Sequence, residues 1–227
     1  VFLFREDGKI KFVELGSSKY NDAMPPDFSI YYAAFASGAA IMALEIIGLG
    51  MLAPYFGAAL LVSTNVIGII LISLAIGYRL GGKWADAHPP KLFGKIFVGE
   101  RIIGGMLFAV AFWIGLIFPW RGAISSTIGW VISINSWGSF FAVTALFGFP
   151  CVVLGMVIPY LIKFNVREAV TSGKSSGILY GLSAIGSIFG TFLIGFIILP
   201  RFHYEGSLAG IVGMLLVGAL LLKIRWQ

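Results

Sequence analysis

Six apolar segments constrain the fold of this chain more than any other feature of its sequence. A helix rises 1.5 Å per residue, so about 20 apolar residues are needed to cross the hydrocarbon core of a bilayer. The segments lie at residues 30–52, 60–80, 93–118, 138–162, 177–199 and 207–224. They predict an all-α, multi-pass membrane bundle of six transmembrane helices, with membrane lipid as its first partner.

The composition excludes an ordinary soluble domain. Charged residues make up 11% of the 227 residues and hydrophobic residues 59%, whereas about 25% of the residues in a soluble domain are charged. The formal net charge is +6, but lysine and arginine gather on the cytoplasmic side of membrane proteins and set their orientation. The positive charge therefore does not indicate binding to nucleic acid.

The basic residues outside the segments are distributed unequally between the two sides. The loops and tail on one side carry Arg79, Lys83, Lys91, Lys95, Lys163, Arg167, Lys174, Lys223 and Arg225. The opposite side carries Arg121 and Arg201. Because positive loops stay in the cytoplasm, this distribution predicts a cell-membrane protein with both termini cytoplasmic. An even number of spans agrees with it.

Two regions fall outside the six segments. Residues 1–27 are rich in charged side chains. Apolar residues alternate with other residues on both sides of Asp7-Gly8, which predicts a small hairpin in a cytoplasmic N-terminal segment. Residues 28–227 form the transmembrane domain. Within it, residues 119–137 contain three tryptophans and are too polar for a clear span, which favours a re-entrant or interfacial helix. A seventh span is the alternative, and it would place the termini on opposite sides.

Glu45 is the strongest candidate for a functional side chain, because it is the single charged residue between positions 30 and 52. A charge inside a span costs about 3 kcal/mol on insertion scales and commonly marks a proton or ion site. The functional interpretation is a substrate or proton site. The structural interpretation is a neutral acid that is hydrogen-bonded to a neighbouring helix.

Three other residues extend this prediction. Asn65, near the start of the second segment, can bond to another helix or line an outer vestibule near the Glu45 site. Pro150 and Pro159 both fall in the fourth segment, where each removes a helix hydrogen bond and kinks the helix. Such a kink is either a moving hinge or a fixed packing shape. Glycines in the fifth and sixth segments predict close helix packing.

The motifs of soluble enzymes are missing from these 227 residues. There is one cysteine, Cys151, and the two histidines, His88 and His203, are far apart, so we expect no metal site and no cofactor. We find no P-loop, no zinc-protease motif and no nucleophile–histidine–acid pattern. We therefore do not expect this chain to be an enzyme.

Four stretches together resemble one family. They read LEIIGLGMLAPYFG (44–57), IGIILISLAIGYRLGGKWAD (67–86), PCVVLGMVIPYL (150–161) and SGILYGLSAIGSIFGTFLIGFIILP (176–200). In this order they resemble the membrane region of the integral-membrane spermidine synthases, which are fused proteins with a membrane part like a major-facilitator transporter. The resemblance implies half of a major-facilitator-like fold and a connection to polyamines. These residues contain no aminopropyltransferase domain, so the family's enzyme activity is not expected here.

The chain also differs from the pattern of that family. The family has an arginine five residues after the acid, where this chain has Gly50, and a tryptophan where this chain has Ser63. Gly82 and Asp86 match the G-x-x-x-D pattern of the loop between the second and third helices of major-facilitator transporters. By that resemblance Asp86 accepts bonds from a helix N-terminus. The alternative is a solvated acid beside Arg79 and Lys83.

Taken together, the sequence predicts a transport-type component for a small cation such as a polyamine. Six spans are half of a twelve-span transporter, so the chain is expected to act as a dimer or with another membrane subunit. Two alternatives remain: a non-catalytic accessory subunit that packs into a larger membrane complex, and a membrane anchor for a separate aminopropyltransferase.

Overall fold

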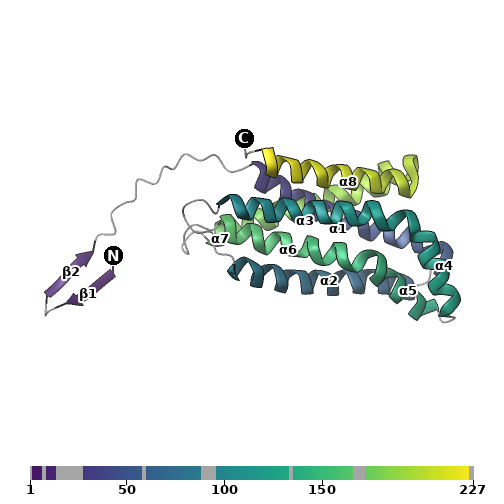
Figure 1. The fold of residues 1–227 in the computed structure, drawn as a ribbon, viewed down its shortest axis with the longest axis horizontal. Helices are drawn as coiled ribbons and strands as arrows, with labels where there is room; N and C mark the ends of the chain where they lie inside the picture. Colours follow the sequence, from purple (N-terminus) through teal and green to yellow (C-terminus); the bar gives the residue numbers. More distant parts are fainter. Residues whose placement is uncertain are drawn as a thin grey trace.

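The computed structural model describes residues 2–6, 9–13, 28–57, 60–87, 96–132, 135–165 and 172–224. Near the N-terminus, strand β1 (Phe2–Glu6) pairs antiparallel with β2 (Lys9–Val13), and Glu6 lies opposite Lys9. This is the pairing that the alternation around Asp7-Gly8 predicts. Almost all of the remaining described chain is helical (Figure 1).

Eight α-helices make up the described part of the bundle. They are α1 (Phe28–Phe56), α2 (Leu60–Ala87), α3 (Ile96–Ile117), α4 (Arg121–Val131), α5 (Asn135–Val143), α6 (Phe149–Asn165), α7 (Ser172–Phe192) and α8 (Leu199–Ile224). A 3₁₀ turn, η1 (Phe118–Trp120), joins α3 to α4. Two π-helical turns join later helices: η2 (Thr144–Gly148) links α5 to α6, and η4 (Leu193–Ile198) links α7 to α8.

Five helical stretches among the described residues are long and apolar enough to cross a membrane. They are Phe28–Phe56, Leu60–Ala87, Arg101–Val131, Trp137–Lys163 and Gly173–Leu222. The fold class is therefore an all-helical bundle suited to a membrane. The last stretch has 50 residues and contains both the fifth and the sixth predicted segments. Its backbone leaves the helical conformation at His203, where φ is 54° and ψ is −165°.

The structure corrects the expected end of the second segment. Helix α2 runs on to Ala87, so Gly82 and Asp86 lie within a helix and not in the predicted loop. The apolar run ends near residue 80, but hydrogen bonding continues because no proline interrupts the chain before residue 89. Residues 119–137 also take part in helices, mainly α4, which follows the turn η1 and bends away from the axis of α3 at one end of the bundle (Figure 1).

Helix α1 is the centre of the bundle. Every residue from 29 to 53 is buried or half-buried, and α1 contacts α2, α6, α7 and α8. Helix α7 follows α1 in the same direction, because Phe35 lies against Gly186 and Ala39 lies against Gly190. A Cβ atom on either glycine would overlap the carbonyl oxygen of its α1 neighbour. These two glycines confirm the close packing expected of the fifth segment.

A second helix pair repeats this contact. Helix α2 follows α6 in the same direction, with Gly77 against Val152 and Gly81 against Met156. In both pairs, glycines four residues apart meet backbone carbonyls four residues apart. A third glycine faces back across each seam: Gly38 of α1 contacts Ser183, and Gly155 of α6 contacts Leu74. The α1–α7 contact and the α6–α2 contact therefore correspond residue by residue.

The remaining contacts follow the same correspondence. Helix α3 runs antiparallel to α8, since Gly104 lies near Ala219 whereas Arg121 forms an ion pair with Glu205. The contact of α1 with α8 is matched by that of α6 with α3. Helices α1, α2 and α3 are thus packed like α6, α7 and α8.

The glycines of the sixth segment, like those of the fifth, do not all lie at a helix contact. Gly218 lies against Leu107 and Tyr32, but Gly210 and Gly213 have no atom within 4 Å of a Cβ position. Small residues therefore do not all mark a helix contact. The prediction of close packing holds on one part of α8 and is wrong on the other.

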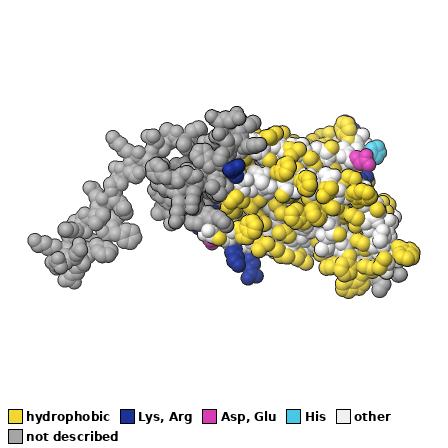
Figure 2. Space-filling view, in the orientation of Figure 1, with side chains coloured by type: hydrophobic (Ala, Val, Ile, Leu, Met, Phe, Trp, Pro, Cys, Tyr) yellow, Lys and Arg dark blue, Asp and Glu magenta, His cyan; other side chains and the backbone are white. Residues whose placement is uncertain are grey.

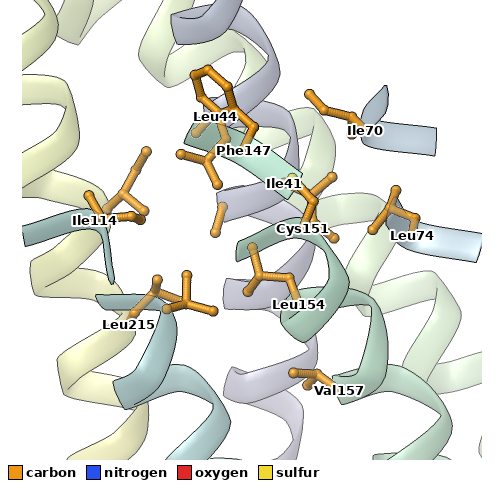
Figure 3. Close-up of a cluster of buried hydrophobic side chains, with 14 of the residues drawn as sticks. Ile41, Leu44, Ile70, Leu74, Ile114, Phe147, Cys151, Leu154, Val157 and Leu215 are labelled. Atoms are coloured by element: carbon orange, nitrogen blue, oxygen red, sulfur yellow. The ribbon is translucent and has the colours of Figure 1, made fainter. Parts of the chain in front are cut away.

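A continuous apolar core joins the central helices. Leu44, Phe147, Cys151 and Leu154 are fully buried within it (Figure 3). On the face that Figure 2 shows, the outer surface is also hydrophobic, and the visible charged and histidine side chains lie toward its two ends. An apolar outer surface between charged ends is suited to lipid as the solvent.

Candidate functional site

Glu45 lies in the middle part of α1, whose residues 29–53 are all buried or half-buried. Its side chain is half-buried, whereas Leu44 next to it is fully buried. Within the part of the chain that the structure describes, no residue forms a hydrogen bond or an ion pair with Glu45. The expected bond to a neighbouring helix is therefore not formed by the described residues, and the carboxyl group is free to hold a proton or a cation.

The surroundings of Glu45 come from α6 and α7. Cys151 of α6 lies within electrostatic range of the carboxyl group. One turn further along α1, Gly48 packs against the ring of Phe147 in η2. The side chain of Ile46 reaches Gly195 in η4. Both π-helical turns therefore lie beside α1 at the depth of Glu45.

Asn65 forms the bond to another helix that was one of its two predicted roles. Its side-chain amide donates a hydrogen bond of 2.8 Å to the hydroxyl of Ser139, which is fully buried in α5. This bond connects α2 to α5, as polar side chains commonly do between transmembrane helices. It does not involve Glu45, so the structure does not bring the two predicted site residues together.

Asp86 forms an ion pair at one end of the bundle. Lys163 of α6 approaches its carboxylate to 2.7 Å, and the side chains of Lys163 and Asp86 are 45% and 71% exposed. The predicted partner was a helix N-terminus, with solvent as the alternative. Gly82, the other member of that motif, has open space around it. The motif therefore contributes an exposed contact between helix ends, and such contacts stabilise proteins by at most about 1 kcal/mol.

Pro150 lies immediately after the π-helical turn η2. A proline has no N–H and clashes with the carbonyl four residues before it, here that of Leu146. The indole N–H of Trp113 in α3 donates to this carbonyl at 3.3 Å, and the two rings of Trp113 and Phe149 are 4.6 Å apart. Trp113 was not predicted from the sequence. A proline indicates that a carbonyl loses its N–H donor, but it does not indicate which residue donates instead.

Pro159 lies in a regular helix. Helix α6 continues through it to Asn165, and no π-helical turn precedes it in this helix. Pro200, which the sequence analysis did not single out, follows η4 in the same way that Pro150 follows η2. A proline shortly after an apolar helical run is the signal in the sequence for both turns.

The space beside Gly50 is filled by a side chain from another helix. A Cβ atom on Gly50 would lie 2.6 Å from the hydroxyl oxygen of Tyr204 in α8. An arginine at this position therefore requires Tyr204 to move. The structure thus has α8 packed directly on the α1 backbone, without a cation five residues after Glu45.

The described residues contain no group of three histidine, cysteine, aspartate or glutamate side chains that could hold a metal ion. The site consists of one carboxyl group in an apolar setting, with two irregular turns beside it. Comparison of the chain with protein-family models, with curated proteins and with solved structures found no match.

Proposed function

We propose that this chain is a membrane transport component for a small cation such as a polyamine, with Glu45 as the acid that holds the amine or a proton. The observation that carries the proposal is the half-buried carboxyl group on the central helix, without an ion pair or hydrogen bond from the described residues. Acids placed in this way within membrane proteins commonly line substrate or proton pathways.

The helix arrangement supports six crossings and half of a major-facilitator-like fold. The stretch Gly173–Leu222 has 50 residues, which is about 75 Å of helix and more than twice the ~30 Å hydrocarbon core. Its two parts run in opposite directions along α1, since Phe35 contacts Gly186 whereas Tyr32 bonds to Met214. The correspondence of α1–α3 with α6–α8 agrees with an inverted repeat.

A six-helix half needs a partner to enclose a substrate site. We propose a second copy of this chain, with Glu45 near the surface between the copies. The positive-inside distribution of lysine and arginine supports cytoplasmic termini in a cell membrane. The resemblance to the membrane region of the spermidine synthases supports a polyamine as the cation.

The test is uptake of labelled spermidine by proteoliposomes that contain the purified protein. We expect Glu45→Gln to lower uptake at least tenfold, because the amide keeps the shape of the side chain but cannot carry the negative charge. The matched control is Glu205→Gln, which removes an acid from the exposed ion pair with Arg121 and should leave uptake unchanged. Full uptake by Glu45→Gln would exclude the proposed role.

The exposed face of α7 favours a second candidate, a non-catalytic accessory subunit. Phe192 and Phe196 stack on each other and are 55% and 73% exposed. Under this alternative Glu45→Gln changes assembly and not uptake, and native mass spectrometry finds a heteromeric complex instead of a homodimer. If the chain anchors a separate aminopropyltransferase, that soluble enzyme should co-purify with it.

A further inference from the structure

The two π-helical turns of the bundle are placed at the same depth, on either side of α1. Turn η2 contacts α1 through Phe147 and Gly48, and turn η4 contacts it through Gly195 and Ile46. Glu45 lies within one turn of both contacts. Across the rest of the described transmembrane helices, the backbone is α-helical apart from the short turn η1 and the bend at His203.

On the α6 side, the turn is held from outside its own helix. Phe147 is fully buried and packs edge-on against Phe118, with the two ring centroids 5.4 Å apart. The carbonyl of Leu146 receives its hydrogen bond from Trp113. Cys151, on the first turn of α6, lies within electrostatic range of Glu45. Turn η2 is therefore linked to the helix of the acid through Phe147, which packs on Gly48 three residues after Glu45.

On the α7 side, the link is shorter. Ile194 is buried, and its carbonyl accepts the N–H of Leu199, five residues later. Pro200 follows and offers no N–H to the carbonyl of Phe196. Ile46, the neighbour of Glu45, is the α1 side chain that reaches this turn.

A π-helical turn behaves as an α-helix with one extra residue. If the turn becomes α-helical, the following residues shift by about one position, which is ~1.5 Å along the axis and ~100° around it. Packed interfaces change between discrete arrangements and do not deform continuously. Two such turns beside one acid can therefore convert a change at that acid into a movement of α6 and α7.

We propose that Glu45, η2 and η4 form one unit, in which a cation or proton at Glu45 sets the conformation of both turns and the turns are the joints of the transport movement. This inference rests on the proposed function and adds to it the moving elements. Trp113 is then a positioning residue, because it acts on η2 and not on the cation.

Cys151 provides a natural reporter, since it is the single cysteine of the sequence and is fully buried. We would measure its rate of alkylation by N-ethylmaleimide in the purified protein, with and without saturating spermidine. We expect spermidine to change the rate at least threefold, and Glu45→Gln to make the rate independent of spermidine. In the control, a Ser73→Cys, Cys151→Ala variant reports from a buried position in the regular part of α2, and its rate should stay constant.

Three proline variants separate movement from simple shielding of the cysteine. Pro150→Ala and Pro200→Ala restore an N–H and favour a regular helix, so each should lower spermidine uptake at least fivefold with Glu45 intact. Pro159→Ala, in the regular part of α6, should leave uptake unchanged.

The outcomes distinguish this inference from the proposed function. If Glu45→Gln abolishes uptake while spermidine does not change the labelling rate of Cys151, η2 and η4 are not the moving elements. The proposed transport function is then retained. The same conclusion follows if Pro150→Ala and Pro200→Ala are folded and fully active. If Glu45→Gln retains full uptake, the proposed function fails, and this inference fails with it.

Discussion

The close contact between α1 and α7 limits which side chains can replace its glycines. A Cβ at Gly186 would overlap the carbonyl of Phe35, whereas a Cβ at Gly181 of the same helix has no atom within 4 Å. We expect Gly186→Val to destabilise the protein by about 1–3 kcal/mol, as overpacking does, and Gly181→Val to have little effect. Thermal unfolding in detergent measures the difference. Equal melting temperatures of the two variants would contradict the close α1–α7 contact at Gly186.

His203 has the conformation that terminates the first part of the long apolar stretch. Its φ of 54° with ψ of −165° falls in a region that only glycine adopts without strain, which costs about 1–3 kcal/mol. We therefore expect His203→Gly to raise the melting temperature and His203→Val to lower it. If both substitutions lower it equally, the histidine side chain is stabilising the turn.

At the scale of elements, polar contacts join α2 to the α5–α6 helix near both of its ends. The Asp86–Lys163 pair is exposed, so Lys163→Ala should cost no more than about 1 kcal/mol, less at high salt. The measurement is thermal unfolding at low and high ionic strength. A larger, salt-independent loss would show that the lysine stem packs against α2.

The bond between Asn65 and Ser139 lies at the opposite end of these helices. A double-mutant cycle with Asn65→Ala and Ser139→Ala should give a coupling of about 0.6 kcal/mol, the average for hydrogen bonds between transmembrane helices. Uptake of spermidine should persist in Asn65→Ala, because its hydrogen bond to Ser139 joins two helices and does not involve Glu45. Loss of uptake with normal stability would indicate that Asn65 belongs to the substrate site.

For the whole molecule, the proposed six-crossing topology predicts which residues share a side of the membrane. In a Cys151→Ala background, single cysteines at Lys83 and Lys174 should react with an impermeant thiol reagent only from the cytoplasm. Cysteines at Ser126 and Glu205 should react only from outside. Labelling of the Lys174 and Glu205 positions from one side would contradict a reversal of the chain between α7 and α8.

The sequence singled out residues of the candidate site but did not predict their contacts. Glu45 and Pro150 stood out because a charge and a proline are costly within an apolar helix. The indole of Trp113, which donates to the Leu146 carbonyl four residues before Pro150, comes from a helix more than 30 residues away in sequence. The Asn65 bond and the Asp86 ion pair likewise depend on which helices are neighbours, which no local pattern specifies.

The sequence by itself determined that this chain is a membrane-suited helical bundle, and it located the acid within it. Long apolar runs specify this class because a chain in lipid must satisfy its backbone hydrogen bonds internally. Only the tertiary structure decided which helices pair and that two π-helical turns lie beside Glu45. In lipid every face of a helix is apolar, so hydrophobicity does not mark the buried face. Close contacts such as that of Gly186 with Phe35 mark the buried face. Such contacts are defined only by the packing of the helices.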